Sequence, residues 1–329
     1  MKFRYHYILA AALIILTASC NKDHLQKPGE PSFDVTTDAT TYKAGQTITF
    51  NINCDADIVA FYSGEPQKEF DYRNGRIIDN SDGGAKLSFN SGVSGGTQGT
   101  LSATAPPQLA VLASTDFNGQ YDYANVTKAT WTDITARFKY ATTATLITST
   151  SVDVSDLLVA GKPIYFAYKY ITKPQAINGT ARSWFLEAFT LVSKKNIGTT
   201  NIPVNPTIVN QILAGFRIVD QNPTTAPARS SVSSSRVTLL GNLYDPVNDP
   251  GNDPQSENWA VSTAINTASI NLGNDKSVAI KDQEKSTPLT NYTFSYAQPG
   301  TYKATFVASN NTVNSTKEVV KQIVLTITP

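Results

Sequence analysis

The end of the chain carries a predicted β-hairpin that most constrains how the chain can fold. Residues 296–310 read YAQPGTYKATFVASN, in which Pro299 and Gly300 favour a turn and apolar residues then alternate with polar ones. A second alternating stretch follows at residues 319–327. Because two strands alone are at best marginally stable in water, we expect other strands of the chain to pair with this hairpin.

The candidate partners lie near the start of the chain. Residues 47–53, TITFNIN, alternate strictly between apolar and polar, and residues 58–62 form a short apolar stretch before Ser63-Gly64. After residue 73 the sequence becomes rich in turns. We therefore expect residues 32–73 and 288–329 to form one β-domain, with residues 74–287 inserted into it.

The insertion also contains strand-like segments separated by turns, such as GKPIYFAYKY at 161–170 and SWFLEAFTL at 183–191. Two antiparallel sheets packed face to face would cover their apolar faces. We expect an all-β protein in which the insertion is a second β-sandwich. The one helix predicted is residues 207–219, where Ile208, Ile212 and Phe216 fall near one face.

The first residues have the order of a secretory signal. Lys2 and Arg4 precede an apolar run at 7–16, which is shorter than the about 20 residues of a membrane-spanning helix. Thr-Ala-Ser then leads to Cys20. We expect residues 1–19 to be a cleaved signal peptide and residues 20–31, which are polar and Pro-rich, to be a flexible tether.

The residues before Cys20 resemble the bacterial lipoprotein signal. The resemblance implies that Cys20 is lipidated after cleavage, so that a lipid anchor attaches the protein to a membrane. Lys22-Asp23 partly resembles the signal that sends Bacteroidetes lipoproteins to the outer face of the outer membrane, whereas His24 departs from it. This favours an outer-membrane location facing the cell exterior, with the periplasmic face as the alternative.

Both chain ends resemble immunoglobulin-like domains of the polycystic-kidney-disease (PKD) type. The segments that carry the resemblance are GQTITF at 45–50, IVAFYSGE at 58–65 and YAQPGTYKATF at 296–306. The chain departs from that family because FYSGE replaces its acidic glycine turn and over 200 residues separate the segments. The layout is similar to a family of unknown function in Bacteroidetes surface lipoproteins. The resemblance implies an Ig-like β-sandwich formed by both chain ends.

The insertion resembles a different family of domains. VDVS at 152–155, GKPIYFAYKY at 161–170 and ENWAVS at 257–262 are similar to galactose-binding-like jelly-roll domains of secreted Bacteroidetes proteins. The resemblance implies that residues 74–287 form a jelly roll.

The sequence contains few patterns that indicate a catalytic site. The only histidines are His6 and His24, in the expected signal and tether, which excludes histidine-dependent catalysis in the folded domains. Glycoside hydrolysis needs only two carboxylates, but no spacing marks a pair among the candidates Glu65, Glu69, Asp133, Glu187 and Glu257. We expect no enzymatic activity. A net charge of +1 without a basic stripe also excludes nucleic acid as the expected partner.

Two sets of residues are candidates for ligand binding. Asp245, Asp249 and Asp253 offer the oxygen donors that calcium takes, although a solvated turn would have the same composition. Aromatic rings could form a sugar-stacking platform, and core packing is the favoured interpretation for any single ring. The candidate rings are Trp131, Trp184, Tyr168, Tyr170 and Trp259.

These observations leave three functions open. The family resemblance implies a non-enzymatic surface lipoprotein that binds glycans as an accessory protein of a polysaccharide-utilisation system. The alternative is a structural or adhesive surface protein that binds another protein. A hydrolase that uses two carboxylates is the third.

Deleting residues 301–329 tests the split arrangement of the expected β-domain. We expect residues 32–73 to lose amide protection in hydrogen exchange, because their partner strands are removed. Native-like protection of residues 32–73 after the deletion would mean that the two chain ends fold as separate β-units.

Overall fold

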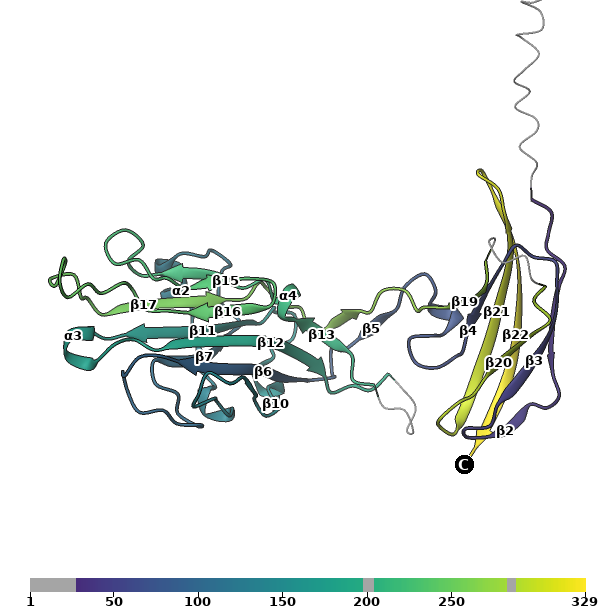
Figure 1. Ribbon diagram of the computed structural model, residues 1–329, viewed down its shortest axis with the longest axis horizontal. Helices are drawn as coiled ribbons and strands as arrows, with labels where there is room; N and C mark the ends of the chain where they lie inside the picture. The colour runs from purple at the N-terminus through teal and green to yellow at the C-terminus, as the bar shows by residue number, and fades with distance from the viewer. Residues whose placement is uncertain (1–27, 198–203, 283–287) are drawn as a thin grey trace, which may run out of the picture. The chain divides into compact units, whose positions relative to one another are not determined.

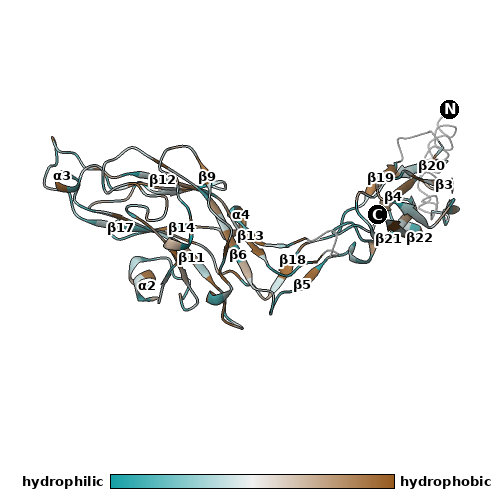
Figure 2. Cartoon of the chain, turned by 90° about the horizontal axis from the view of Figure 1, so that it is seen from below, coloured by the Kyte–Doolittle hydropathy of each residue, from teal (hydrophilic) through white to brown (hydrophobic). Residues whose placement is uncertain are grey.

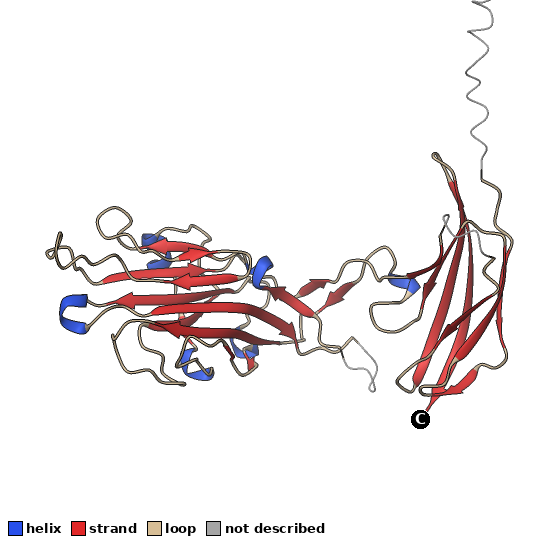
Figure 3. Cartoon of the chain, in the orientation of Figure 1, coloured by secondary structure: helices blue, strands red, loops and turns tan. Residues whose placement is uncertain are grey.

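The structure is a computed structural model that describes residues 28–197, 204–282 and 288–329. The expected signal peptide, Cys20 and most of the expected tether therefore lie outside the described residues. Strands make up nearly all the regular structure and the helices are short (Figure 3), so the all-β prediction is confirmed. None of the helices in the described ranges is long and apolar enough to cross a membrane.

The chain forms two compact units, both drawn in Figure 1. The split unit ends its first segment at Asn74 and resumes at Asn274, and the inserted unit comprises Gly75–Gly273. Strand β19 (Val278–Lys281) pairs with β4 (Ile58–Tyr62). The chain therefore returns to the split unit at residue 274, earlier than the boundary at 288 expected from the sequence.

The split unit contains a three-stranded sheet in the order β1-β3-β20 and a five-stranded sheet in the order β19-β4-β21-β22-β2. The predicted hairpin is β21–β22, and β21 also pairs with β4, with Phe306 opposite Phe61. The partner expected for the hairpin near the start of the chain is thus confirmed. The other strands are β1 (Phe33–Thr37), β2 (Thr41–Lys43), β3 (Ile48–Cys54), β20 (Asn291–Phe294), β21 (Gly300–Asn311) and β22 (Thr316–Thr328).

Aromatic rings from both chain ends fill the space between these two sheets. The ring centroid of Phe306 lies 5.0 Å from that of Phe50 in β3 and 4.9 Å from that of Phe61 in β4. All three rings are buried. The buried Tyr296 hydroxyl donates a hydrogen bond of 2.6 Å to the carbonyl oxygen of Ser63. The core of the split unit therefore needs both segments of the chain.

The inserted unit is a second sandwich of two large sheets. The seven-stranded sheet has the order β10-β6-β12-β16-β15, with β13 on β12 and β9 on β6; the five-stranded sheet has the order β14-β17-β11-β7-β8. The strands of the seven-stranded sheet are β6 (Ala85–Ser94), β9 (Ile147–Thr148), β10 (Val152–Asp153), β12 (Ser183–Ser193), β13 (Thr207–Asn210), β15 (Ser231–Val232) and β16 (Arg236–Leu239). Those of the five-stranded sheet are β7 (Leu109–Ser114), β8 (Thr132–Asp133), β11 (Tyr165–Thr172), β14 (Arg217–Asp220) and β17 (Ser256–Val261).

A separate two-stranded sheet pairs β5 (Ile77–Asp79) with β18 (Ser269–Asn271), next to the two points where the chain enters and leaves the inserted unit. Both strands carry hydrophobic residues (Figure 2), and Ile270 is buried.

Strand β11 shows how the five-stranded sheet divides core from outer face. Phe166, Tyr168 and Tyr170 point between the sheets and belong to the main hydrophobic core of the inserted unit. Because successive side chains of a strand point to opposite faces, Lys169 and Ile171 lie on the outer face, where they line surface hollows.

The helix predicted at 207–219 is wrong for most of its length. Residues 207–210 form β13 and pair with β12, and residues 217–220 form β14 and pair with β17. Only α4 (Gln211–Ala214) is helical, and it ends at Gly215, whose φ of 54° is left-handed. Pairing with neighbouring strands on both sides of α4 therefore outweighs the helical spacing of the apolar residues. That spacing is also compatible with the single helical turn of α4.

Replacing Phe306 by alanine tests the shared core of the split unit. We expect the free energy of unfolding to fall by about 3–5 kcal/mol, because a buried ring is removed and leaves a cavity. Val313→Ala is the control on the same hairpin, since Val313 is 90 % exposed, and should change stability by less than about 0.5 kcal/mol. Chemical denaturation measures both, and equal effects of the two substitutions would contradict the assignment.

Candidate functional site

Three of the five candidate aromatic residues lie in the core of the inserted unit. Trp184, Tyr168 and Tyr170 are buried between its two sheets. The Trp184 indole donates to the carbonyl oxygen of Pro107 over 3.1 Å, and burial raises the pKa of Tyr170 to about 12. A ring enclosed on both sides has no face for a sugar, so the platform interpretation is corrected for these three and core packing describes them.

The other two candidates, Trp131 and Trp259, come together on the outer face of the five-stranded sheet. Their ring centroids are 5.3 Å apart at an interplanar angle of 47°. Trp259 lies on β17 and is only 3 % exposed, and Trp131 directly precedes β8. The Trp131 indole donates to the carbonyl oxygen of Val126 in α2 (Tyr123–Lys128) over 2.8 Å, which holds a half-buried ring in place.

The segment that contains α2 covers part of this outer face. Phe117 and Val126 of the segment pack with Tyr165 and Trp259 of the sheet in a second, smaller apolar cluster. The strand residues of this cluster, such as Tyr165 in β11 and Trp259 in β17, alternate along their strands with residues of the main core. Trp131 packs at its margin as a partly buried ring.

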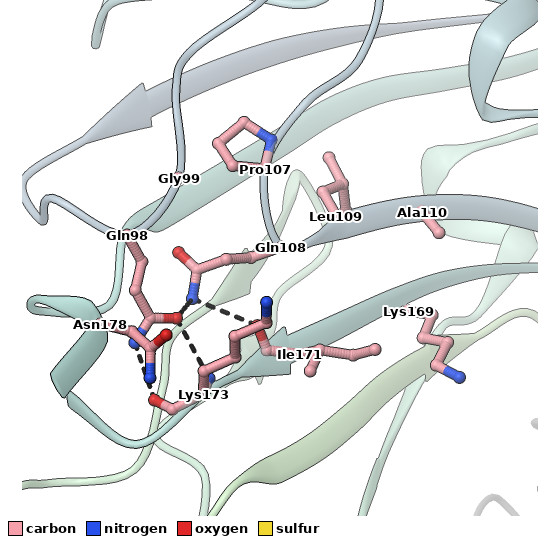
Figure 4. A pocket seen from close by; sticks show the side chains of 10 residues that line it. All are labelled: Gln98, Gly99, Pro107, Gln108, Leu109, Ala110, Lys169, Ile171, Lys173 and Asn178. Carbon is pink, nitrogen blue, oxygen red and sulfur yellow. Dashed lines mark hydrogen bonds between the residues drawn. The ribbon is translucent and has the colours of Figure 1, made fainter.

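Beside this covered part, the outer face is hollowed in two adjoining places. One hollow of about 560 Å³ extends past Gln98, Gln108 and Lys173 (Figure 4), and the other, of about 460 Å³, extends past Trp131, Trp259 and Glu257. Both are lined by Ala110, Lys169 and Ile171. We call the two together the outer groove, with an amide end at Gln98 and Gln108 and an aromatic end at Trp131 and Trp259.

A charged pair lies at the aromatic end. Lys169 Nζ is 2.9 Å from Glu257 Oε2, and their side chains are 27 % and 13 % exposed. Glu257 Oε1 accepts a hydrogen bond of 2.8 Å from the Trp259 indole and one of 3.4 Å from the Tyr123 hydroxyl. Lys169 Nζ also lies 5.0 Å from the centroid of the Trp259 ring, within cation–π range. These contacts fix the orientation of Trp259.

Two glutamines close the amide end (Figure 4). Gln98 Nε2 donates to the carbonyl oxygens of Lys173 (2.7 Å) and Gly179 (2.9 Å). Gln108 Nε2 donates to Gln98 Oε1 over 2.8 Å, and Gln108 Oε1 accepts from the Arg182 amide over 2.9 Å. Gln108 has a φ of 67°, a conformation that is uncommon for residues other than glycine. These hydrogen bonds hold it there and make this wall of the groove rigid.

Of the three aspartates proposed for calcium, Asp245 and Asp249 belong to one turn, in which the Asp249 amide donates to the Asp245 carbonyl oxygen over 3.1 Å, whereas Asp253 contacts a different segment. Asp245 Oδ1 accepts from the amides of Val247 and Asn248, both over 2.9 Å, and the hydrogen bonds from Asn248 lower its pKa. Asp253 accepts from the amides of Gln175 and Ala176, at the start of α3 (Gln175–Asn178). In the part of the chain that the structure describes, no group of three or more His, Cys, Asp or Glu is arranged to hold a metal ion. The solvated-turn alternative therefore describes this loop.

Two of the carboxylates considered for hydrolysis, Asp133 and Glu257, line the same hollow. Glu187 instead pairs with Arg236 on the seven-stranded sheet, and Glu65 pairs with Lys68 in the split unit.

The sequence interpretation did not include Lys169, Gln98 and Gln108 among the site residues. Lys169 could have been found, because it lies between Tyr168 and Tyr170 in an alternating strand and must point outward if they point inward. Gln98 and Gln108 lie in a turn-rich stretch whose contacts are made by residues far along the chain, and no local pattern marks them.

Glu257→Gln tests whether the charged pair stabilises the outer groove. We expect the free energy of unfolding to fall by about 1–3 kcal/mol, because a largely buried charged hydrogen bond is lost. Glu187→Gln removes the same charge from the more exposed pair with Arg236 and should cost less than about 1 kcal/mol. Denaturation followed by tryptophan fluorescence measures both, and an equal or larger cost for Glu187→Gln would contradict the assignment.

Comparison with known proteins places the chain in a family. No curated protein and no solved structure matches it. The family model described as "Domain of unknown function (DUF5017)" matches residues 19–211, which is more than half of the 329-residue chain. The match runs from the first segment of the split unit into the inserted unit and includes Trp131 and Lys169, whereas Glu257 and Trp259 lie beyond it. The chain belongs to the DUF5017 family.

Proposed function

We propose that this protein is a non-enzymatic, lipid-anchored cell-surface protein that binds glycans in the outer groove. The observation that carries the proposal is the half-buried ring of Trp131, which packs on the buried Trp259 beside an open hollow that also contains Lys169 and Glu257. The apolar faces of sugar rings stack on aromatic rings, and surrounding polar groups fix their orientation. Trp131 and the charged pair of Lys169 and Glu257 beside it together supply both contacts.

The anchor and location rest on the sequence. The resemblance around Cys20 to a lipoprotein signal supports lipidation, and the resemblance to Bacteroidetes surface lipoproteins supports an outer-membrane location facing the exterior. A glycan-binding protein at that place would act as an accessory protein of a polysaccharide-utilisation system and hold the chain near the cell.

The contacts of the two carboxylates in the groove support a non-enzymatic function. A glycosidase needs one carboxyl group that donates a proton and a second that attacks the sugar or activates water. Both oxygens of Glu257 have partners in Lys169, Trp259 and Tyr123, and Asp133 Oδ1 accepts from the Thr135 amide over 2.8 Å. Reducing sugar released by the wild type and not by Glu257→Gln would overturn this part of the proposal.

A second candidate function, docking to another protein, is favoured by a different observation. Ile177 in α3 and Val247 in the loop before Asp253 are 86 % and 82 % exposed, and Asp253 joins that loop to α3 by accepting hydrogen bonds from the amides of Gln175 and Ala176. Exposed aliphatic side chains that gather in one patch mark contact surfaces. Co-purification from intact cells, compared between wild type and Ile177→Ser, distinguishes this function from glycan binding.

Affinity electrophoresis against plant, host and microbial polysaccharides tests the proposed function. We expect the wild type to be retarded by at least one polysaccharide, and Trp131→Ala to lose most of that retardation because the stacking ring is removed. Trp131→Phe keeps a smaller ring and should retain part of it.

Tyr244→Ala is the matched control, since Tyr244 is a half-buried aromatic residue of the same unit that does not line the outer groove. Thermal unfolding of each variant separates a lost contact from lost folding. The proposal fails if no polysaccharide retards the wild type, or if Trp131→Ala folds normally and is retarded as strongly as the wild type.

A further inference from the structure

The amide end of the outer groove is positively charged. Its hollow is lined by two ionisable residues, Lys169 and Lys173, and by no aspartate or glutamate. Lys169 pairs with Glu257, whereas Lys173, just after β11, is exposed and forms no ion pair within the described residues. One uncompensated ammonium group therefore remains at this end.

The other polar side chains of this end are already used inside the protein. Gln98 Nε2 donates to two carbonyl oxygens, and Gln98 Oε1 accepts from Gln108 and from the Lys173 amide. Gln108 Nε2 donates to Gln98 and, over 3.2 Å, to the carbonyl oxygen of Ile171. Asn178 Nδ2 donates to the carbonyl oxygen of Pro174 over 2.8 Å. The charged donor left for a ligand is the Lys173 ammonium group, which suits an anionic acceptor.

The aromatic end has the opposite character. Its hollow contains Asp133 and Glu257 beside Lys169, so that acidic groups outnumber basic ones where the two tryptophans lie. A negatively charged sugar would be repelled there, whereas an uncharged sugar face can stack on Trp131. Because the hollows share Ala110, Lys169 and Ile171, one chain can occupy both.

We infer that the outer groove binds a linear anionic glycan, with an uncharged sugar at Trp131 and a carboxylate- or sulfate-bearing sugar at Lys173. This inference rests on the proposed function and adds the class of glycan. Lys173 recognises the charge of the ligand, and the ring of Trp131 recognises a sugar face.

Isothermal titration of the intact protein with matched polysaccharides tests the inference. The probes are alginate and polygalacturonate, the same two polymers after reduction of their carboxyl groups to alcohols, and dextran sulfate beside plain dextran. We expect an acidic polymer to bind more tightly than its uncharged counterpart, and raising the salt from about 0.02 M to about 0.3 M to remove the difference by screening. Comparing the two uronate polymers with dextran sulfate shows whether a carboxylate or a sulfate group is recognised.

Lys173→Gln should lower affinity for the acidic polymer roughly two- to fivefold, the range for one exposed charge pair, and leave affinity for the uncharged counterpart unchanged. Lys139→Gln is the control, since Lys139 is an exposed lysine of the same unit away from the groove. The inference is overturned if charged and uncharged polymers bind equally, or if Lys173→Gln has no effect on binding of the acidic polymer. In either case the proposed function still stands if binding depends on Trp131. If no probe or other polysaccharide binds, both fail.

Discussion

The inserted unit depends on the two-residue periodicity of strand β11. This strand lies between β7 and β17 and has side chains on both faces of the five-stranded sheet. Tyr168 and Tyr170 fill the core, while Lys169 and Ile171 lie in the outer groove. A shift of one residue in register would exchange these sets, which would bury a charge and expose two tyrosines. The packing that stabilises the sandwich therefore also determines which residues line the outer groove.

The groove itself depends on what covers the rest of that face. The segment that contains α2 buries the outer side chains of Tyr165 and Val261 and places Trp131 next to Trp259. At the other end the hydrogen-bonded glutamines hold the wall, including Gln108 with its left-handed backbone. A rigid wall and an oriented tryptophan reduce the entropy that a ligand must offset on binding, which favours recognition of an extended chain.

The split unit follows a different constraint, because each of its two sheets combines strands from both chain segments. Phe306 from the C-terminal hairpin packs on Phe50 and Phe61 from the first segment, and this contact closes the core. The inserted unit has its own core, made only of residues between 85 and 265.

The sequence by itself determined the all-β class, the hairpin and its partner strand, because alternation and turn residues are local signals. It also selected Trp131 and Trp259, but could not separate them from Trp184, Tyr168 and Tyr170, since all five are aromatic residues in or next to strands. Only the tertiary structure decided which rings lie between the sheets and which meet on the outer face. It also decided that residues 207–219 are mainly strand and that Asp245 and Asp253 serve separate turns. The physical reason is that burial and sheet pairing are set by residues distant in the chain.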